Sequence, residues 1–181
     1  GEWCRRGEEE LCPEHAATCR HNFGGFADRV RAQTRFAGPI PKDLPSEKFA
    51  ALLCAGITVY TPLTRHAGAG ARVAVIGIGG LGHLALQFAR AMGCEVAAYS
   101  RRPDKEADAR WFGAHEFSTG KPPRKAYDVV LNTAHAAPSF EAFIKALRPR
   151  GVFCQVGAAQ YFFHVGAVFF YAALFHLHSY Q

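Results

Sequence analysis

The sequence contains no block of five or six consecutive basic residues, although 21 Lys and Arg outnumber 15 Asp and Glu. The formal net charge is +6, and the basic residues occur in pairs such as Arg5 with Arg6. Proteins that bind nucleic acid gather such residues in a long run or on one face. We therefore expect no nucleic-acid partner; an anionic cofactor is another reason for a basic balance.

An apolar signal segment is also absent from the first residues, which read Gly-Glu-Trp-Cys. Disulfide frameworks belong mainly to secreted proteins, whereas cytosolic cysteines stay reduced. The six cysteines lie in very different sequence contexts. We expect reduced thiols and a cytoplasmic protein.

Charged residues are missing from residues 151–177, a stretch longer than the roughly 20 residues that span a bilayer. Gln155, Gln160 and His164 interrupt this stretch, and polar groups at that density are costly in hydrocarbon. Two buried strands, or a strand and a helix, explain the composition. We expect no membrane association, with a membrane span of residues 151–177 as the alternative.

A chain of 181 residues has room for one full domain, or for one domain and a piece of another. Residues 1–50 are irregular and rich in Gly and Pro, as turns and loops are. Within them, residues 25–32 alternate loosely and have room for one short strand. Ser46 has the character of an N-cap and precedes a helical stripe of apolar residues.

From Arg72 onward, apolar runs alternate with amphipathic segments. The runs 73–76, 95–99, 127–131 and 151–156 predict buried strands. Residues 81–92, 104–112 and 139–147 predict helices between and after them. This alternation predicts an α/β fold with a Rossmann-type doubly wound parallel sheet, which has helices on both faces.

A glycine turn of the form G-x-G-x-x-G separates the first predicted strand from its helix. Its residues are Gly77, Ile78, Gly79, Gly80, Leu81 and Gly82. In this pattern the glycines permit a tight turn, a close approach of backbone N–H groups to a pyrophosphate, and packing of the helix on the strand. The helix N-terminus then faces the anion. We expect a dinucleotide site; a tight turn without a ligand is the alternative.

The end of the second predicted strand indicates which dinucleotide is bound. NAD-binding domains usually place Asp or Glu there, against the ribose 2′-hydroxyl. This sequence has Ser100, Arg101 and Arg102 instead, with Lys105 one turn later. Guanidinium groups match the geometry of a phosphate. The segment therefore favours the 2′-phosphate of NADP(H), with a solvated basic loop as the alternative.

Two further motifs contain cysteine. Residues 4–12 read C-x2-G-x-E-x2-C, and residues 53–60 read Leu-Cys-Ala-Gly-Ile-Thr-Val-Tyr. Together with Gly-Gly-Phe-Ala at 24–27 and the glycine turn, their order and spacing resemble the zinc-dependent medium-chain alcohol dehydrogenases, in the cinnamyl alcohol dehydrogenase branch. The resemblance runs from residue 1 to Ala158 and is faint beyond.

The resemblance implies two parts: residues 1–50 as a remnant of the GroES-like, zinc-binding catalytic domain, and residues 51–181 as the NADP-binding Rossmann domain. It also implies an enzyme truncated at the N-terminus and at the C-terminus. Cys4 and Cys12 match two of the four cysteines that hold a structural zinc. The second cysteine falls on Gly1 and the first before it, so this zinc site is expected to be incomplete, since such sites need four ligands.

The same resemblance implies roles around a catalytic zinc and the nicotinamide. Cys54 matches one zinc ligand, and the other ligands have no counterpart in this sequence. Thr58 matches a catalytic position near the nicotinamide. The remaining cofactor-lining positions match Thr133, Val156, Gly157 and Ala158.

The function implied is hydride transfer between NADP(H) and a primary alcohol or aldehyde, with zinc polarising the substrate oxygen. The leading interpretation is a fragment of such an oxidoreductase. A catalytically inactive NADP(H)-binding module that lacks the zinc ligands is the alternative. The apolar tail leaves a homodimer open, and the substrate itself cannot be inferred.

Overall fold

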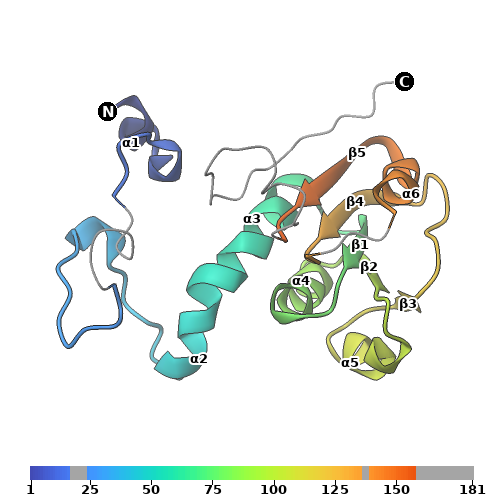
Figure 1. Ribbon diagram of the computed structural model, residues 1–181, viewed down its shortest axis with the longest axis horizontal. Coiled ribbons are helices and arrows are strands. Elements are labelled where there is room, and N and C mark those ends of the chain that lie inside the picture. Colours follow the sequence, from blue (N-terminus) through green and yellow to red (C-terminus); the bar gives the residue numbers. More distant parts are fainter. Residues whose placement is uncertain (17–23, 136–138, 158–181) are drawn as a thin grey trace. The chain divides into compact units, whose positions relative to one another are not determined.

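The chain divides into two compact units, Gly1–Ser46 and Glu47–Gln181, each considered by itself. A computed structural model describes residues 1–16, 24–135 and 139–157 (Figure 1). The described residues of the first unit form three short helices: α1 (Glu2–Arg6), η1 (Glu9–Leu11) and η2 (Thr34–Phe36). The boundary predicted after residue 50 between a catalytic-domain remnant and a Rossmann domain stays a prediction about domain identity.

The short strand expected at residues 25–32 is wrong, because this segment forms turns and bends. Phe26 is 97% exposed and Val30 is 58% exposed, so these apolar side chains do not form a buried face. A strand needs neighbouring strands and a face to bury, and alternation alone supplies neither.

The second unit is built on a five-stranded parallel sheet with the strand order β3-β2-β1-β4-β5. Its strands are β1 (Arg72–Ile76), β2 (Glu95–Tyr99), β3 (Glu116–Ser118), β4 (Tyr127–Asn132) and β5 (Leu147–Gln155). The helices after the first two strands are α4 (Gly80–Ala91), η4 (Pro103–Lys105) and α5 (Glu106–Trp111). The predicted Rossmann-type α/β fold is confirmed. The three-residue strand β3 was not predicted.

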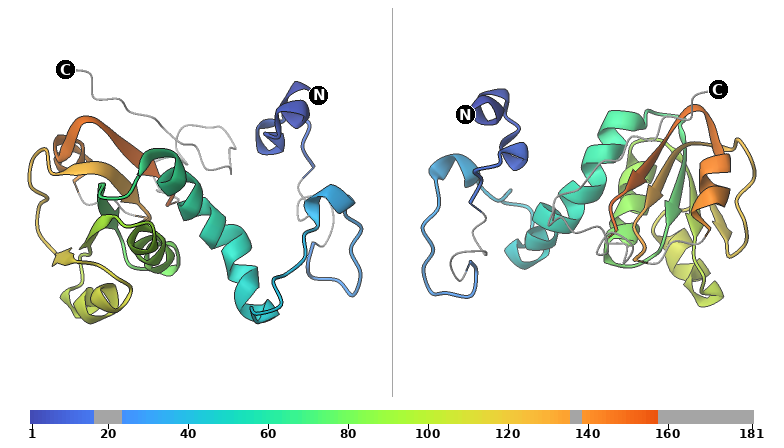
Figure 2. Two further views of the ribbon diagram at one scale, coloured as in Figure 1. Left: turned by 180° about the vertical axis from the view of Figure 1, so that it is seen from behind. Right: turned by 45° about the horizontal axis from the view of Figure 1, so that its top comes forward.

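Successive residues of each strand enter two different cores, as the period of two in a strand requires. Val73 and Val75 of β1 pack with α3 (Ile57–His66) and α4 on one face of the sheet. Ala74 and Ile76 pack on the other face with α6 (Phe140–Lys145). The two helix layers are visible in Figure 2. The sheet is therefore buried on both sides, which explains the nearly continuous apolar strands.

The helix expected from Ser46 is present and has a wider turn in the middle. It runs from α2 (Ser46–Ala51) through the π-helical turn η3 (Leu52–Gly56) into α3. The helix before β5 begins as predicted, since Ser139 accepts a hydrogen bond from the backbone N of Ala142. By contrast, residues 119–126, which connect β3 to β4, contain no helix.

Candidate functional site

The glycine turn follows β1 and leads directly into α4. Gly77 has a φ of +88°, a conformation that residues with side chains rarely adopt. A Cβ atom on Gly82 would lie 1.9 Å from the carbonyl oxygen of Gly77. By contrast, Gly79 and Gly80 have no atom within 4 Å of such a Cβ position. Gly77 and Gly82 thus close the turn, whereas Gly79 and Gly80 leave open space in front of the helix.

Thr133 ties the end of β4 to this turn. Its buried hydroxyl lies 2.8 Å from the carbonyl oxygen of Ile76 and 3.0 Å from that of Gly77, and donates to them. The carboxyl ends of β1 and β4 are thereby held together. In open α/β sheets, ligands bind at this edge, where neighbouring connections leave the sheet on opposite sides.

A hollow of about 510 Å³ opens at this edge, called here the glycine hollow. Its lining residues are Ala55, Gly77, Gly79, Gly80, Leu81, Arg101, Thr133, Ala134 and His135. Six of the sequence-predicted cofactor residues are in this set. Ala55, Ala134 and His135 were not predicted, although each adjoins a segment that the sequence singled out.

The other predicted cofactor residues that the structure describes do not line the hollow. Ile78 packs against the core, and Gly82 is the buried contact under the turn. Val156 and Gly157 follow β5, where their backbone N–H groups both donate to the carbonyl oxygen of Asn132 at 3.0 Å. Ala158 lies outside the described residues.

A buried amide network fixes the adjoining ends of β4 and β5. Asn132 is fully buried, and its side-chain nitrogen donates to Gln155 Oε1 at 2.8 Å. Asn132 Oδ1 accepts from the backbone N of Ala134, and Gln155 Nε2 donates to the carbonyl oxygen of Gly157. The network holds the backbone on both sides of Thr133 in one conformation.

The basic segment after β2 presents its residues in different ways. Arg101 reaches the glycine hollow. Arg102 forms an exposed ion pair with Asp104, and Lys105 lies 2.8 Å from the carboxylate of Asp108. Ser100 accepts a hydrogen bond from the backbone N of Arg102. Of the predicted phosphate ligands, Arg101 alone both lines the hollow and makes no ion pair among the described residues.

The predicted zinc ligands belong to no larger group of possible metal ligands in the described residues. Cys54 is exposed on η3, beside Ala55 of the glycine hollow, and Thr58 is partly buried one turn later on α3. Cys4 and Cys12 are half-buried in the first unit. Nowhere in the described parts of the chain do three His, Cys, Asp or Glu residues gather as a metal would need. The residues described here therefore do not fit a zinc ion.

The remaining described cysteines are packing residues. Cys94 and Cys154 are buried in the core that faces α4. Burial raises the pKa of the Cys154 thiol to about 12, and it raises the pKa of Cys94 as well. Since the thiolate is the form that binds metals and attacks substrates, neither thiol is suited to those roles.

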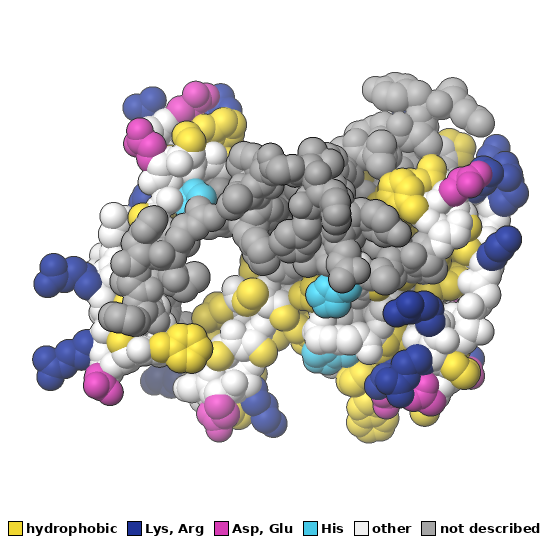
Figure 3. Space-filling view, in the orientation of Figure 1, with side chains coloured by type: hydrophobic (Ala, Val, Ile, Leu, Met, Phe, Trp, Pro, Cys, Tyr) yellow, Lys and Arg dark blue, Asp and Glu magenta, His cyan; other side chains and the backbone are white. Residues whose placement is uncertain are grey.

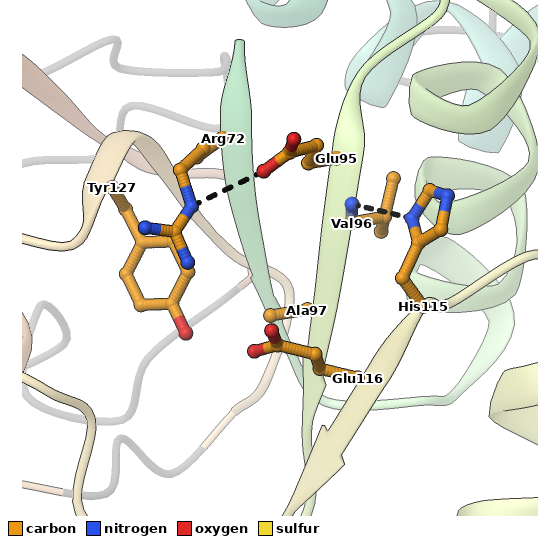
Figure 4. A pocket seen from close by; sticks show the side chains of 7 residues that line it. All are labelled: Arg72, Glu95, Val96, Ala97, His115, Glu116 and Tyr127. Carbon is orange, nitrogen blue, oxygen red and sulfur yellow. Dashed lines mark hydrogen bonds and ion pairs between the residues drawn. The ribbon is translucent and has the colours of Figure 1, made fainter. Parts of the chain in front are cut away.

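A second hollow, of about 360 Å³, lies at the opposite ends of the strands (Figure 4). Its lining residues begin their strands or lie near the beginning: Arg72, Glu95, Val96, Ala97, His115, Glu116 and Tyr127. Arg72 is neutralised by Glu95, at 3.4 Å, and its backbone N donates to Asp128. This end of a parallel sheet is not where the fold binds dinucleotides.

Basic and acidic side chains are interspersed on the face of the molecule in Figure 3, with no broad basic patch. Exposed pairs such as Arg110 with Glu106 and Lys145 with Glu141 illustrate the mixing. Among helices formed by described residues, none is long and apolar enough to cross a bilayer, and the tail from residue 158 lies outside that part.

Comparison with known proteins places this geometry in a family. The family model for the zinc-binding dehydrogenases matches residues 80–179, more than half of the chain. This chain is a member of the zinc-binding dehydrogenase family. The resemblance found in the cysteine and glycine motifs is therefore confirmed, while its expected fading beyond Ala158 is wrong, since the match continues to residue 179.

The solved relatives of this zinc-binding dehydrogenase chain are similar over the described fold. A cinnamyl alcohol dehydrogenase from Sorghum bicolor is 32% identical with a TM-score of 0.81, over 88% of this chain and 50% of its own. The CAD from Helicobacter pylori, complexed with NADP(H), is 30% identical with a TM-score of 0.78, over 88% and 49%.

An aldehyde reductase of Synechocystis is 37% identical over an alignment of 161 residues, and the match covers 85% of this chain and 48% of the relative. The chain spans about half the length of the curated relatives it matches. Within the zinc-binding dehydrogenases it is similar to the cinnamyl alcohol dehydrogenases.

Proposed function

We propose that this chain provides the NADP(H)-binding part of an oxidoreductase that interconverts primary alcohols and aldehydes. The observation that carries the proposal is the glycine hollow, which combines an open helix N-terminus with a guanidinium group. NADP(H), when bound, supplies or accepts the hydride. The names of relatives support the cofactor and the substrate class, since one is complexed with NADP(H) and another is an aldehyde reductase.

Each part of the hollow has a role in holding the dinucleotide. The N–H groups at Gly79 and Gly80 are the donors for a pyrophosphate, because α4 begins there without a side-chain cap. Arg101 supplies a charge for the 2′-phosphate. Thr133, with its hydroxyl bound to the glycine turn, keeps the floor of the hollow in place. The space that Gly79 and Gly80 leave empty fits a group that approaches the backbone closely.

A substitution that fills the hollow without disturbing the fold tests this proposal. Gly79 has an extended backbone with φ −107° and no atom near its Cβ position, so Gly79→Val adds a side chain to empty space. The wild-type chain is expected to bind NADPH more tightly than NADH, measured by the enhanced fluorescence of the nicotinamide. In Gly79→Val, NADPH binding is expected to weaken at least about tenfold, a loss of about 1.4 kcal/mol.

The matched control is Gly68→Val, which also points into empty space but lies before β1, away from the hollow. Its thermal unfolding midpoint and its NADPH affinity should remain close to those of the wild type. Equal NADPH binding by Gly79→Val and Gly68→Val would place the dinucleotide elsewhere and reject the proposal.

A second candidate function is an NADP(H)-binding module without turnover. The donor set favours it for the 181-residue chain, since Cys54 has no cluster of further ligands among the described residues. In both candidates the glycine hollow binds the dinucleotide, so binding alone does not separate them. Assays of zinc content and turnover separate the two.

A further inference from the structure

The two arginines after β2 have opposite surroundings, although they are adjacent in sequence. Arg101 lines the glycine hollow. Two guanidinium nitrogens of Arg102 donate to the carboxylate of Asp104: Nε lies 3.0 Å from Oδ1, and Nη2 contacts Oδ2. A guanidinium uses this same two-pronged edge to hold a phosphate. Asp104 therefore occupies the binding edge of Arg102.

Local backbone structure keeps this pair together. The backbone N of Arg102 donates to Ser100 Oγ at 3.1 Å, and Pro103 then begins the short helix η4. Asp104 is the second residue of that helix, two positions after the arginine that it holds. The Arg102 guanidinium holds the pKa of the Asp104 carboxyl below its usual range, so the carboxylate is charged at neutral pH.

We propose that Asp104 is a specificity-determining residue that competes with the 2′-phosphate of NADP(H) for Arg102. The inference rests on the proposed function, because it assumes that the glycine hollow binds a dinucleotide. In this arrangement Arg101 carries most of the preference for a 2′-phosphate. Binding of the phosphate to Arg102 requires that the Asp104 carboxylate be displaced, which lowers the preference that two adjacent arginines would otherwise give.

Because the Arg102–Asp104 pair is exposed, a phosphate can displace the carboxylate from the guanidinium. The side chains of Arg102 and Asp104 are 70% and 57% exposed, and ion pairs at such positions are weak. A phosphate with two negative charges can therefore exchange with one carboxylate. NAD(H) has a 2′-hydroxyl at this position and gains little from displacing Asp104.

The decisive substitution is Asp104→Asn, which removes the charge and keeps the size of the side chain. We expect NADPH binding by the 181-residue chain to tighten about threefold to tenfold at low ionic strength. NADH binding should change less than about twofold, and the gain for NADPH should shrink in high salt. Nicotinamide fluorescence during titration measures both affinities without turnover.

Two further variants test the mechanism. Glu141→Gln removes one carboxylate of a comparable exposed ion pair, with Lys145 on α6, and is expected to leave the ratio of NADPH to NADH affinity unchanged. In an Arg102→Ala background, Asp104→Asn should no longer tighten NADPH binding, because the contested guanidinium is gone. A gain that persists in that background would overturn the competition.

An unchanged affinity ratio in Asp104→Asn would also overturn the inference, while leaving the proposed function intact. If the wild-type chain bound neither dinucleotide, the proposed function itself would fail. The binding data for the wild type and the variant thus distinguish the two failures.

Discussion

Among single residues of the glycine turn, Gly82 has the least room for a side chain. Gly82→Ala would place a Cβ atom 1.9 Å from a backbone oxygen, so the strand or the helix must move. We expect the free energy of unfolding to fall by about 1–3 kcal/mol, the usual cost of overpacking, and NADPH binding to weaken. Urea denaturation measures the first effect.

The matched control for this prediction is Gly80→Ala. Gly80 is the first residue of α4 and has open space at its Cβ position. Alanine there should leave stability unchanged or raise it, because glycine costs about 0.5–1 kcal/mol inside a helix relative to alanine. Identical urea midpoints for the two alanine variants would show that glycine is not sterically required at position 82.

The spacing of these glycines was enough to predict the tight turn. The sequence does not, by contrast, predict which residues form ion pairs. Ser100, Arg101 and Arg102 were expected to act together on a phosphate, and the structure separates Arg101 from Arg102. Whether a carboxylate two residues away folds back onto an arginine depends on the local turn. No pattern of residue types encodes that geometry in advance.

Between elements, the Asn132–Gln155 pair joins the carboxyl ends of β4 and β5. Gln155→Leu would leave the buried amide nitrogen of Asn132 without its partner. An unsatisfied buried donor costs about 1–3 kcal/mol, so the urea midpoint should fall accordingly. The matched control is Gln87→Leu on α4, where the amide donates to the carbonyl oxygen of His83 at an exposed position.

The control should change stability by less than about 0.5 kcal/mol, as surface substitutions usually do. If Gln155→Leu were as stable as Gln87→Leu, the amide pair would contribute nothing to joining the strands.

The regular elements were predictable where burial gives a strong pattern. The continuous apolar runs of β1, β2 and β4 predicted those strands, and the capping Ser139 predicted the start of α6. β3 is three residues long and only partly buried, too short for a pattern to emerge. The π-helical turn η3 was not predicted, because nothing in the residues Leu52–Gly56 marks a wider turn within a helix.

For the whole molecule, zinc content follows from where the cysteines lie. Cys4 and Cys12 belong to the first unit and Cys54 to the second. A closed zinc site needs four ligands, and the described residues contain no group of three. We expect elemental analysis of the 181-residue chain to give well below one zinc per chain. Tightly bound zinc near two per chain would contradict this prediction.

We expect no detectable alcohol oxidation or aldehyde reduction by residues 1–181 alone, with NADP(H) and added zinc. Cys54 is a single, exposed candidate ligand, so a metal bound there would not be fixed against the nicotinamide. Turnover that Cys54→Ser abolished would show that a metal site forms from other residues.

The fold class could be predicted from the sequence, because alternating strands and helices admit few topologies. The glycine turn of the hollow could also be predicted, since its residues are contiguous in sequence, whereas Ala55, Ala134 and His135 reach the hollow from distant segments. A metal site is assembled from distant residues, so its completeness depends on tertiary structure. The motifs around Cys54 indicated the family correctly, but they do not show that a ligand set exists.

The brevity of β3 affects how the protein behaves at high concentration. An edge strand presents unpaired backbone groups that can recruit a strand from another molecule and begin aggregation. β3 offers only Glu116–Ser118 at this edge, and the exposed cations Lys121, Arg124 and Lys125 follow it closely. Short edges flanked by positive charge are poor templates for such growth, so we expect this side of the sheet to resist intermolecular pairing.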